Sequence, residues 1–259
     1  MIEGNHNGIV AEAQDFLERA IPLADLERPH TGEIHVWSLD LAELAGALRD
    51  ALDGHRSVPA GFTAGQLLFA RRFYLRLLLG AYLGLPGKAV RISRKNRGKP
   101  VLDQSVHDVK LNFSMAKSEH NLLVGFSTSS YLGVDLEPTS RRARDAMGVA
   151  RRYFSPDEAG ALGALPPDGL DAAFLRVWAC KEAVVKASGY GIANQFGRFT
   201  VETDLTRPAA VLDFDGKGPD GWTLALVRPG GGFLGAIAVR QDISTLKAFR
   251  LLSVPHSSA

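Results

Sequence analysis

The sequence predicts an α+β protein built from two related lobes. Each half of the 259-residue chain contains a long helix followed by several strands, in the same rough order. Helices and strands that come in separate runs are typical of α+β architectures. The length is sufficient for one large domain or for two of about 100 to 130 residues each. We expect an appendage over residues 1–32, a first lobe over 33–132, a second lobe over 133–245 and a tail over 246–259.

The clearest helix of the first half covers residues 67–83. Apolar side chains recur there at helical spacing, arginines occupy the other side, and Gly84 is a stop signal. Period-two alternation and turn residues predict strands on both sides of it. The remaining elements are a strand at 33–39, a short helix at 41–52, strands at 89–93, 109–115, 121–126 and 131–137, and a basic turn at 94–100.

The second half is organised around a long helix that contains Trp178 and Lys186 and ends before Gly189. Two shorter helices precede it, at 145–154 and from residue 156, the latter with Ser155 as N-cap. Strands are expected near 196–202, 210–214, 222–227 and 233–239.

Composition narrows the function classes. The net charge of +2 is too small to indicate nucleic-acid binding. One cysteine excludes an internal disulfide framework and fits a reducing compartment. No apolar run reaches the roughly 18 residues of a membrane helix, and the acidic N-terminus does not resemble a signal peptide. We expect a cytoplasmic protein with no membrane or nucleic-acid partner.

Two carboxylates lie two residues apart in the strand at 131–137. Asp135 and Glu137 therefore project to one face. Adjacent carboxylates repel each other unless water or a cation separates them, and Mg²⁺ prefers one or two such ligands together with phosphate oxygens. The alternative is a strand edge that exposes two acids to water.

The long helix carries a third acid. Helical spacing sets Trp178 beside Glu182, and Glu182 beside Lys186. If this helix packs across the acidic strand, Glu182 is a third oxygen ligand. The alternative is an exposed Glu–Lys pair of the kind common on helix surfaces.

Other constellations are weaker. The seven histidines show no metal-ligand spacing, and no phosphate-binding G-x-x-x-x-G-K-[ST] is present. Cys180 is turned away from the ridge of Glu182 and is better explained as a small buried side chain than as a nucleophile. Lys99, between a glycine and a proline, is placed to hold an anion, or is simply part of a basic turn.

Five motifs together resemble the 4′-phosphopantetheinyl transferases of the pseudodimeric type that serves peptide and polyketide synthases. They follow the order of that family over about residues 33 to 240. The motifs are Gly98-Lys99-Pro100, Leu111-Asn112-Phe113-Ser114, Gly133-Val134-Asp135-Leu136-Glu137, Arg152-Tyr153-Phe154-Ser155-Pro156-Asp157-Glu158 and the run from Trp178 to Lys186.

The resemblance implies two similar α+β lobes related by a pseudo-twofold axis, with coenzyme A in the cleft between them. It implies transfer of the phosphopantetheine arm of coenzyme A to a serine of an acyl or peptidyl carrier protein, with release of adenosine 3′,5′-bisphosphate. By motif, Asp135, Glu137 and Glu182 hold Mg²⁺, and Glu182 is the base. The implied coenzyme-binding residues are Asp135, Lys181, Lys186, Lys99, Pro100, Ser114 and Arg91, and Glu158 is a structural acid.

One position departs from the family pattern. Met115 stands where the family usually has a histidine that contacts the 3′-phosphate of the coenzyme, and Lys117 is the nearest substitute along the sequence. A thioether cannot donate a hydrogen bond, and a charge-assisted bond contributes about 1.5–3 kcal/mol. Residues 61–65 carry no charged side chain, where the family commonly has a basic stretch before the first long helix. Both features are expected to lower the affinity for coenzyme A. Neither changes Asp135, Glu137 or Glu182.

Carrier proteins are acidic, and five arginines follow the acidic strand: Arg141, Arg142, Arg144, Arg151 and Arg152. They are expected either to steer the carrier or to form a solvated helix face. Two alternative hypotheses about function stay open. One is a relative that binds coenzyme A or a carrier protein without turnover, and the other is a magnesium-dependent coenzyme A hydrolase. Two lobes in one chain make a monomer sufficient.

Overall fold

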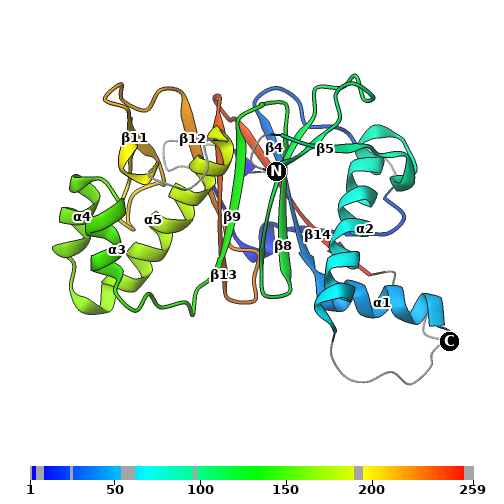
Figure 1. Ribbon diagram of the computed structural model, residues 1–259, viewed down its shortest axis with the longest axis horizontal. Helices are drawn as coiled ribbons and strands as arrows, with labels where there is room; N and C mark the ends of the chain where they lie inside the picture. Colours follow the sequence, from blue (N-terminus) through cyan, green and yellow to red (C-terminus); the bar gives the residue numbers. More distant parts are fainter. Residues whose placement is uncertain are drawn as a thin grey trace.

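The computed structural model describes residues 2–3, 9–23, 26–53, 62–95, 98–189 and 195–253. The protein is α+β, as predicted, and its layers run helices, sheet, sheet, helices (Figure 1). Three positions used in the sequence analysis, Gly61, Asn96 and Arg97, lie outside the described residues.

One sheet has six strands. Its order is β1-β14-β4-β8-β7, with β3 also paired to β14. β14 runs parallel to β4, and β4, β8 and β7 are antiparallel neighbours. The strands are β1 (Ile2–Glu3), β3 (Leu17–Ala20), β4 (Glu33–Asp40), β7 (Asn112–Ser118), β8 (Asn121–Ser127) and β14 (Thr245–Leu252).

The second sheet has four strands in the order β2-β12-β13-β9. These are β2 (Ile9–Ala11), β9 (Leu132–Pro138), β12 (Trp222–Val227) and β13 (Phe233–Arg240). Two short antiparallel ribbons complete the strands, β5 (Ile92–Arg94) with β6 (Pro100–Leu102), and β10 (Phe199–Val201) with β11 (Val211–Phe214).

Helices cover the outer faces of both sheets (Figure 1). α1 (Leu41–Asp53) and α2 (Ala64–Leu83) pack on the six-stranded sheet, and α3 (Ala146–Tyr153), α4 (Pro156–Gly163) and α5 (Pro167–Ser188) pack on the four-stranded one. Short 3-10 turns occur at Ala13–Asp15, Gly87–Ala89 and Phe196–Arg198. The predicted stops are confirmed, because Gly84 and Gly189 both adopt left-handed C-cap conformations, with φ of 67° and 74°.

The inner faces of the two sheets share one apolar layer. Two glycines allow this close packing: a Cβ at Gly125 would lie 2.8 Å from Val134 Cγ2, and one at Gly235 would lie 2.6 Å from Leu123 Cδ2. The edge strands also meet, since the Ser114 hydroxyl on β7 accepts a hydrogen bond from the Val134 N–H on β9 at 3.1 Å. The sheets therefore form a single packed unit.

The expected boundaries at both ends of the chain were wrong. The expected tail contains most of β14, which lies between β1 and β4 in the larger sheet, and the expected appendage supplies β1, β2 and β3. The boundary at residue 132 falls inside β9. Backbone hydrogen bonding between distant segments joins the chain ends to both sheets.

No helix in the described ranges combines the length and the apolar character that a membrane crossing requires.

A buried histidine makes folding stability depend on pH. The ring Nδ1 of His35 accepts from the Tyr82 hydroxyl at 2.8 Å, and burial lowers the pKa of His35 to about 4. Glu33 and Lys247 are the charged groups beside it, and Glu33 Oε1 lies 3.4 Å from Nε2. The folded state therefore holds the neutral ring.

We expect stability to fall between pH 6.5 and 4, because only the unfolded chain binds a proton on this histidine in that window. The loss attributable to His35 reaches about 3 kcal/mol. Urea unfolding of the wild type and of His35→Gln at pH 7 and pH 4 measures it. Equal pH dependence in the two proteins would contradict the assignment.

Candidate active site

The long helix lies along the acidic strand. Helix α5 presents Trp178, Glu182 and Lys186 on one ridge, each four residues from the next. The indole Nε1 of Trp178 donates to Glu137 Oε1 at 3.0 Å, and Lys186 Nζ donates to Asp135 Oδ1 at 2.6 Å. Because both ends of the ridge bond to β9, Glu182 is held between them, facing the two acids of the strand.

A glycine permits this approach. Gly133 precedes Asp135 by two residues and therefore lies on the same face of β9. A Cβ at this position would lie 1.9 Å from the carbonyl oxygen of Ala183 and 2.5 Å from the amide nitrogen of Ala187. Any larger residue would force the helix outward. The glycine of the G-V-D-x-E motif thus sets the distance between the acids and the helix.

The acids are buried and electrostatically strained. Glu182 is 7% exposed. Burial raises the pKa of Glu182, nearby Asp135 and Glu137 raise it further, and Lys186 and Arg141 oppose the shift. Asp135 Oδ2 is buried without a hydrogen-bond partner. An unpaired carboxylate oxygen beside a crowded carboxylate is an environment that a cation stabilises.

The acids do not form a closed metal cage. In the described part of the chain, no three acidic, histidine or cysteine side chains are arranged to hold a metal ion together. Glu137 is engaged by Arg141, whose Nη1 lies 2.5 Å from Oε1, and by Trp178. Cationic side chains supply the counter-charges of Asp135 and Glu137 in this structure. Ligation of Mg²⁺ by all three acids stays a prediction.

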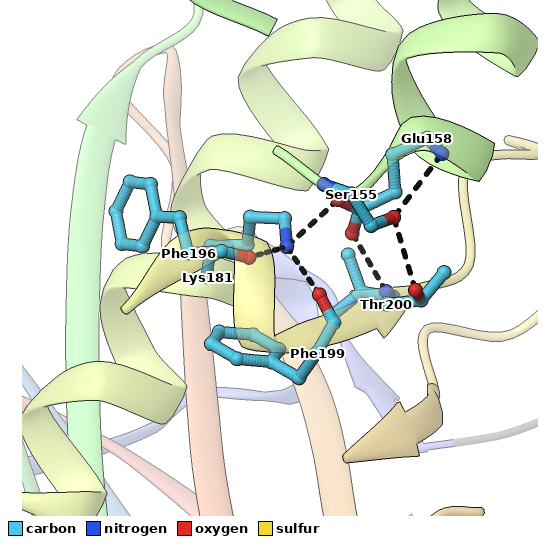
Figure 2. Close-up of polar contacts among 7 residues, drawn as sticks. Ser155, Glu158, Lys181, Phe196, Phe199 and Thr200 are labelled. Carbon is cyan, nitrogen blue, oxygen red and sulfur yellow. Dashed lines mark hydrogen bonds and ion pairs between the residues drawn. The ribbon is translucent and has the colours of Figure 1, made fainter. Parts of the chain in front are cut away.

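Lys181 does not lie where the motif implied. It is fully buried, and its ammonium donates to Glu158 Oε2, to the carbonyl of Phe196 and to the carbonyl of Phe199, each at 2.7 Å (Figure 2). All three N–H groups are thus used inside the protein, so none is left for a coenzyme phosphate. Cys180 beside it is also buried, and burial raises the pKa of its thiol to about 12, as expected for a structural cysteine.

Glu158 links the N-terminus of helix α4 to strand β10. Its carboxylate accepts from the Ser155 N–H at 2.9 Å, which closes a capping box at the start of α4, and from the Val201 N–H at 2.7 Å (Figure 2). The hydroxyl of Thr200 donates to Ser155 Oγ at 3.0 Å. With Lys181 as counter-ion, Glu158 has the structural place expected for it, and the predicted N-cap at Ser155 is confirmed.

Lys99 bridges the two halves of the protein. Its ammonium donates to the carbonyl of Leu132 at 2.8 Å and to that of Lys186, in the last turn of α5, at 2.7 Å. Burial, with a smaller effect of Lys95, lowers the pKa of Lys99 to about 8. The lysine borders a cavity of about 510 Å³ lined by residues of both halves, among them Arg94, Lys95, Asn112, Ser188 and Gly189.

The other predicted coenzyme residues are spread over the first half. Ser114 is buried and already bonded to β9, and Pro100 is half-buried in β6. Arg91 is exposed one residue before β5, where its backbone N–H donates to His107 Nε2. Met115 and Pro100 line a common cavity. The structure thus gathers Asp135, Glu137, Glu182 and Lys186 at one place and leaves Arg91 apart.

The chain is similar to known proteins over much of its length. A profile of the 4′-phosphopantetheinyl transferase superfamily matches residues 131–238, which contain β9 and α5. Over 224 residues the chain is 30% identical to 4′-phosphopantetheinyl transferase HetI of Nostoc sp., an alignment that covers 80% of the chain and 87% of HetI. The chain belongs to the 4′-phosphopantetheinyl transferase superfamily. The predicted resemblance to the 4′-phosphopantetheinyl transferase family is confirmed.

Two further relatives match over shorter lengths. The transferase is 28% identical to the human L-aminoadipate-semialdehyde dehydrogenase-phosphopantetheinyl transferase over 55% of the chain and 50% of that protein. It is 30% identical to 4′-phosphopantetheinyl transferase psf-1 of Bacillus pumilus over 52% of the chain and 57% of psf-1. As a member of this superfamily, it transfers the phosphopantetheine arm of coenzyme A to carrier proteins.

The transferase also has an aromatic cavity that sequence reasoning missed. It measures about 700 Å³ and borders the ridge at Trp178. Its walls include Tyr153, Phe154, Phe174 and Phe196. Nothing in the sequence signals this opening, because the rings come from α3, the residue that follows it, α5 and a 3-10 turn, whose arrangement is set by the fold.

Only some of the arginines that follow β9 form ion pairs with described residues. Arg141 pairs with Glu137, and Arg142 pairs with Asp171 at 2.9 Å. Arg144 and Arg151 are exposed and form no ion pair with another described residue. Arg144 and Arg151 are therefore accessible to an acidic partner.

Proposed function

We propose that this transferase makes holo-carrier proteins of the acyl or peptidyl type, with Glu182 as general base. The observation that carries the proposal is the packing of α5 on β9: Trp178 bonds to Glu137 and Lys186 bonds to Asp135, and Glu182 lies on the ridge between Trp178 and Lys186. A base, a group of carboxylates and an ammonium at one place are what phosphoryl transfer to a hydroxyl requires.

We also propose that Asp135, Glu137 and Glu182 are the residues that hold Mg²⁺. The support is the unpaired, buried Asp135 Oδ2 together with the raised pKa of Glu182, since both groups are stabilised by a cation. The ion, when bound, would neutralise negative charge on the pyrophosphate of coenzyme A.

The residues of the chain then have separate tasks. Glu182 accepts the hydroxyl proton of the carrier serine while the serine oxygen bonds to the phosphorus of the phosphopantetheine phosphate. The P–O bond that joins this phosphorus to adenosine 3′,5′-bisphosphate breaks in the same step. Lys186 keeps about a third of its side chain exposed, so it can contact the phosphate oxygens, which the buried Lys181 cannot. A positioned base contributes roughly 10²- to 10⁴-fold to the rate.

Several finer points belong to the same proposal. Coenzyme A occupies the cleft between two lobes related by a pseudo-twofold axis, and Lys99 contributes to that cleft. The carrier docks on the basic face of Arg144 and Arg151, because acidic carrier domains complement it. A cytoplasmic monomer is part of the proposal, since one chain supplies both lobes.

Incubation with coenzyme A, Mg²⁺ and an apo carrier protein tests the function. We expect a serine-linked mass gain of one phosphopantetheine on the carrier, and loss of that gain in EDTA. Coenzyme binding without product would favour an inactive relative. Coenzyme cleavage without carrier modification would favour a hydrolase.

A further inference from the structure

Two side chains of the first half bind the outer edge of the acidic strand. Strand β9 is an edge strand of its sheet and lies between α5 and the six-stranded sheet (Figure 1). The backbone groups of Leu132 and Val134 point to the same edge, because residues two apart in a strand do so. Lys99 donates to the Leu132 carbonyl at 2.8 Å, and Ser114 accepts from the Val134 N–H at 3.1 Å. These side chains take the place of a neighbouring strand at these two groups.

The ammonium of Lys99 also holds the end of helix α5. Lys186 is in the last turn of this helix, where backbone carbonyls lack partners within the helix. Lys99 donates to the Lys186 carbonyl at 2.7 Å, and a positive charge is favourable at a helix C-terminus. One ammonium therefore joins the last turn of α5 to the first residue of β9.

This contact lies at one end of the ridge that faces the acids. The side chain of Lys186 donates to Asp135 Oδ1 at 2.6 Å, and Glu182 lies one turn earlier on α5. Strand and helix are in close contact here, since a Cβ at Gly133 would lie 1.9 Å from the Ala183 carbonyl oxygen. A shift of the last turn of α5 along or away from β9 would therefore move Glu182 and Lys186 relative to Asp135.

The turn that carries Lys99 fixes the place of the lysine. Gly98 has a left-handed conformation with φ of 83°, and its N–H donates to the Lys95 carbonyl at 2.9 Å. The Lys95 N–H donates to the Lys99 carbonyl at 2.9 Å, and Pro100 begins β6. The Gly-Lys-Pro motif thus presents the lysine from a closed turn.

We propose that Lys99 is a positioning residue for phosphopantetheine transfer, which holds the last turn of α5 on β9 and so keeps Glu182 and Lys186 beside the acids. This inference rests on the proposed function. The resemblance implied coenzyme contacts for Lys99 and Ser114. Two of the three N–H groups of Lys99 and the hydroxyl oxygen of Ser114 are instead engaged by the backbone of the second half. Lys99 thus acts on the reaction through α5 and β9, with Ser114 supporting the same strand edge.

Lys99→Met tests this inference, because it keeps an apolar stem and removes the N–H donors. We expect kcat for carrier modification to fall about 10- to 100-fold, as for a displaced catalytic group, while the Kd for coenzyme A from calorimetry stays the same. Amide hydrogen exchange, followed by mass spectrometry, should become about tenfold faster in residues 132–138 and 183–189 and stay the same in β12. Lys88→Met removes an exposed lysine of the same half and should change none of these quantities.

Ser114→Ala is the second variant, and it replaces Lys99→Met if the Tm of that variant shows a loss of folding. It removes the acceptor of the Val134 N–H, so we expect a lower kcat and faster exchange in residues 132–138. Unchanged exchange would overturn the inference, and so would a normal kcat, because the contacts would then serve folding alone. A Kd for coenzyme A weakened about tenfold or more with a normal kcat would make Lys99 a coenzyme ligand.

The wild type separates this inference from the proposed function. If the wild type modifies a carrier while the variants keep its kcat or its exchange rates, only the positioning role is wrong. If the wild type modifies no carrier, the proposed function is wrong and the positioning role is lost with it.

Discussion

Glu182→Gln should lower the rate of carrier modification by at least about 100-fold, because it removes the proposed base and one carboxylate ligand together. The amide has the same shape as the carboxylate but cannot accept the serine proton. Rates of phosphopantetheine transfer at saturating coenzyme A and carrier measure the effect.

The same substitution should not weaken folding. The raised pKa of Glu182 means that its ionised form is disfavoured in the folded protein beside Asp135 and Glu137, so a neutral side chain relieves that repulsion. We expect a Tm equal to or above that of the wild type. Asp168→Asn is the matched control, since it neutralises an exposed acid at the other end of α5 and should leave the rate unchanged. Normal transfer by Glu182→Gln would remove this residue as the base.

Elements with regular apolar spacing or an almost continuous apolar run were predictable from the sequence. Helices α2 and α5 follow from apolar spacing and glycine stops, and strands β12 and β13 from runs bounded by turns. β14 was missed because Lys247 and Arg250 interrupt its apolar residues, and because it is buried on both faces. Leu246 and Ala248 face the layer between the sheets, whereas Phe249 and Leu251 face the helices α1 and α2. A strand that serves two cores shows no single alternation of apolar and polar residues.

The sequence could predict which acids share a face, because strand and helix geometry decide it. It could not predict the buried position of Lys181. Residues two apart in a strand and four apart in a helix share a face, which placed Asp135 with Glu137 and Glu182 with Lys186. Lys181 is next to Glu182 in sequence, but successive helical residues project about 100° apart. It therefore points toward the side of α5 that holds Phe196 and Phe199, and only the fold shows its acidic partner 23 residues earlier.

Lys181→Met should unfold the transferase at a much lower temperature and leave the affinity of the folded protein for coenzyme A unchanged. The substitution leaves the buried Glu158 carboxylate without its counter-ion, and the carbonyls of Phe196 and Phe199 without their donor (Figure 2). Loss of one partner of a buried pair costs about 3–5 kcal/mol, which corresponds to a fall in Tm of roughly 10 °C in a chain of this size. Lys217→Met, at an exposed lysine, is the control.

A double-mutant cycle separates the ion pair from simple loss of packing. Glu158→Gln alone leaves the Lys181 ammonium buried without a carboxylate, whereas Glu158→Gln/Lys181→Met removes both charges from the interior. We expect the double variant to be destabilised by less than the sum of the single variants, with a coupling of about 1–3 kcal/mol. If instead Lys181→Met kept the wild-type Tm and raised the KM for coenzyme A tenfold or more, Lys181 would be a phosphate ligand, and its buried ion pair with Glu158 would not persist in the working enzyme.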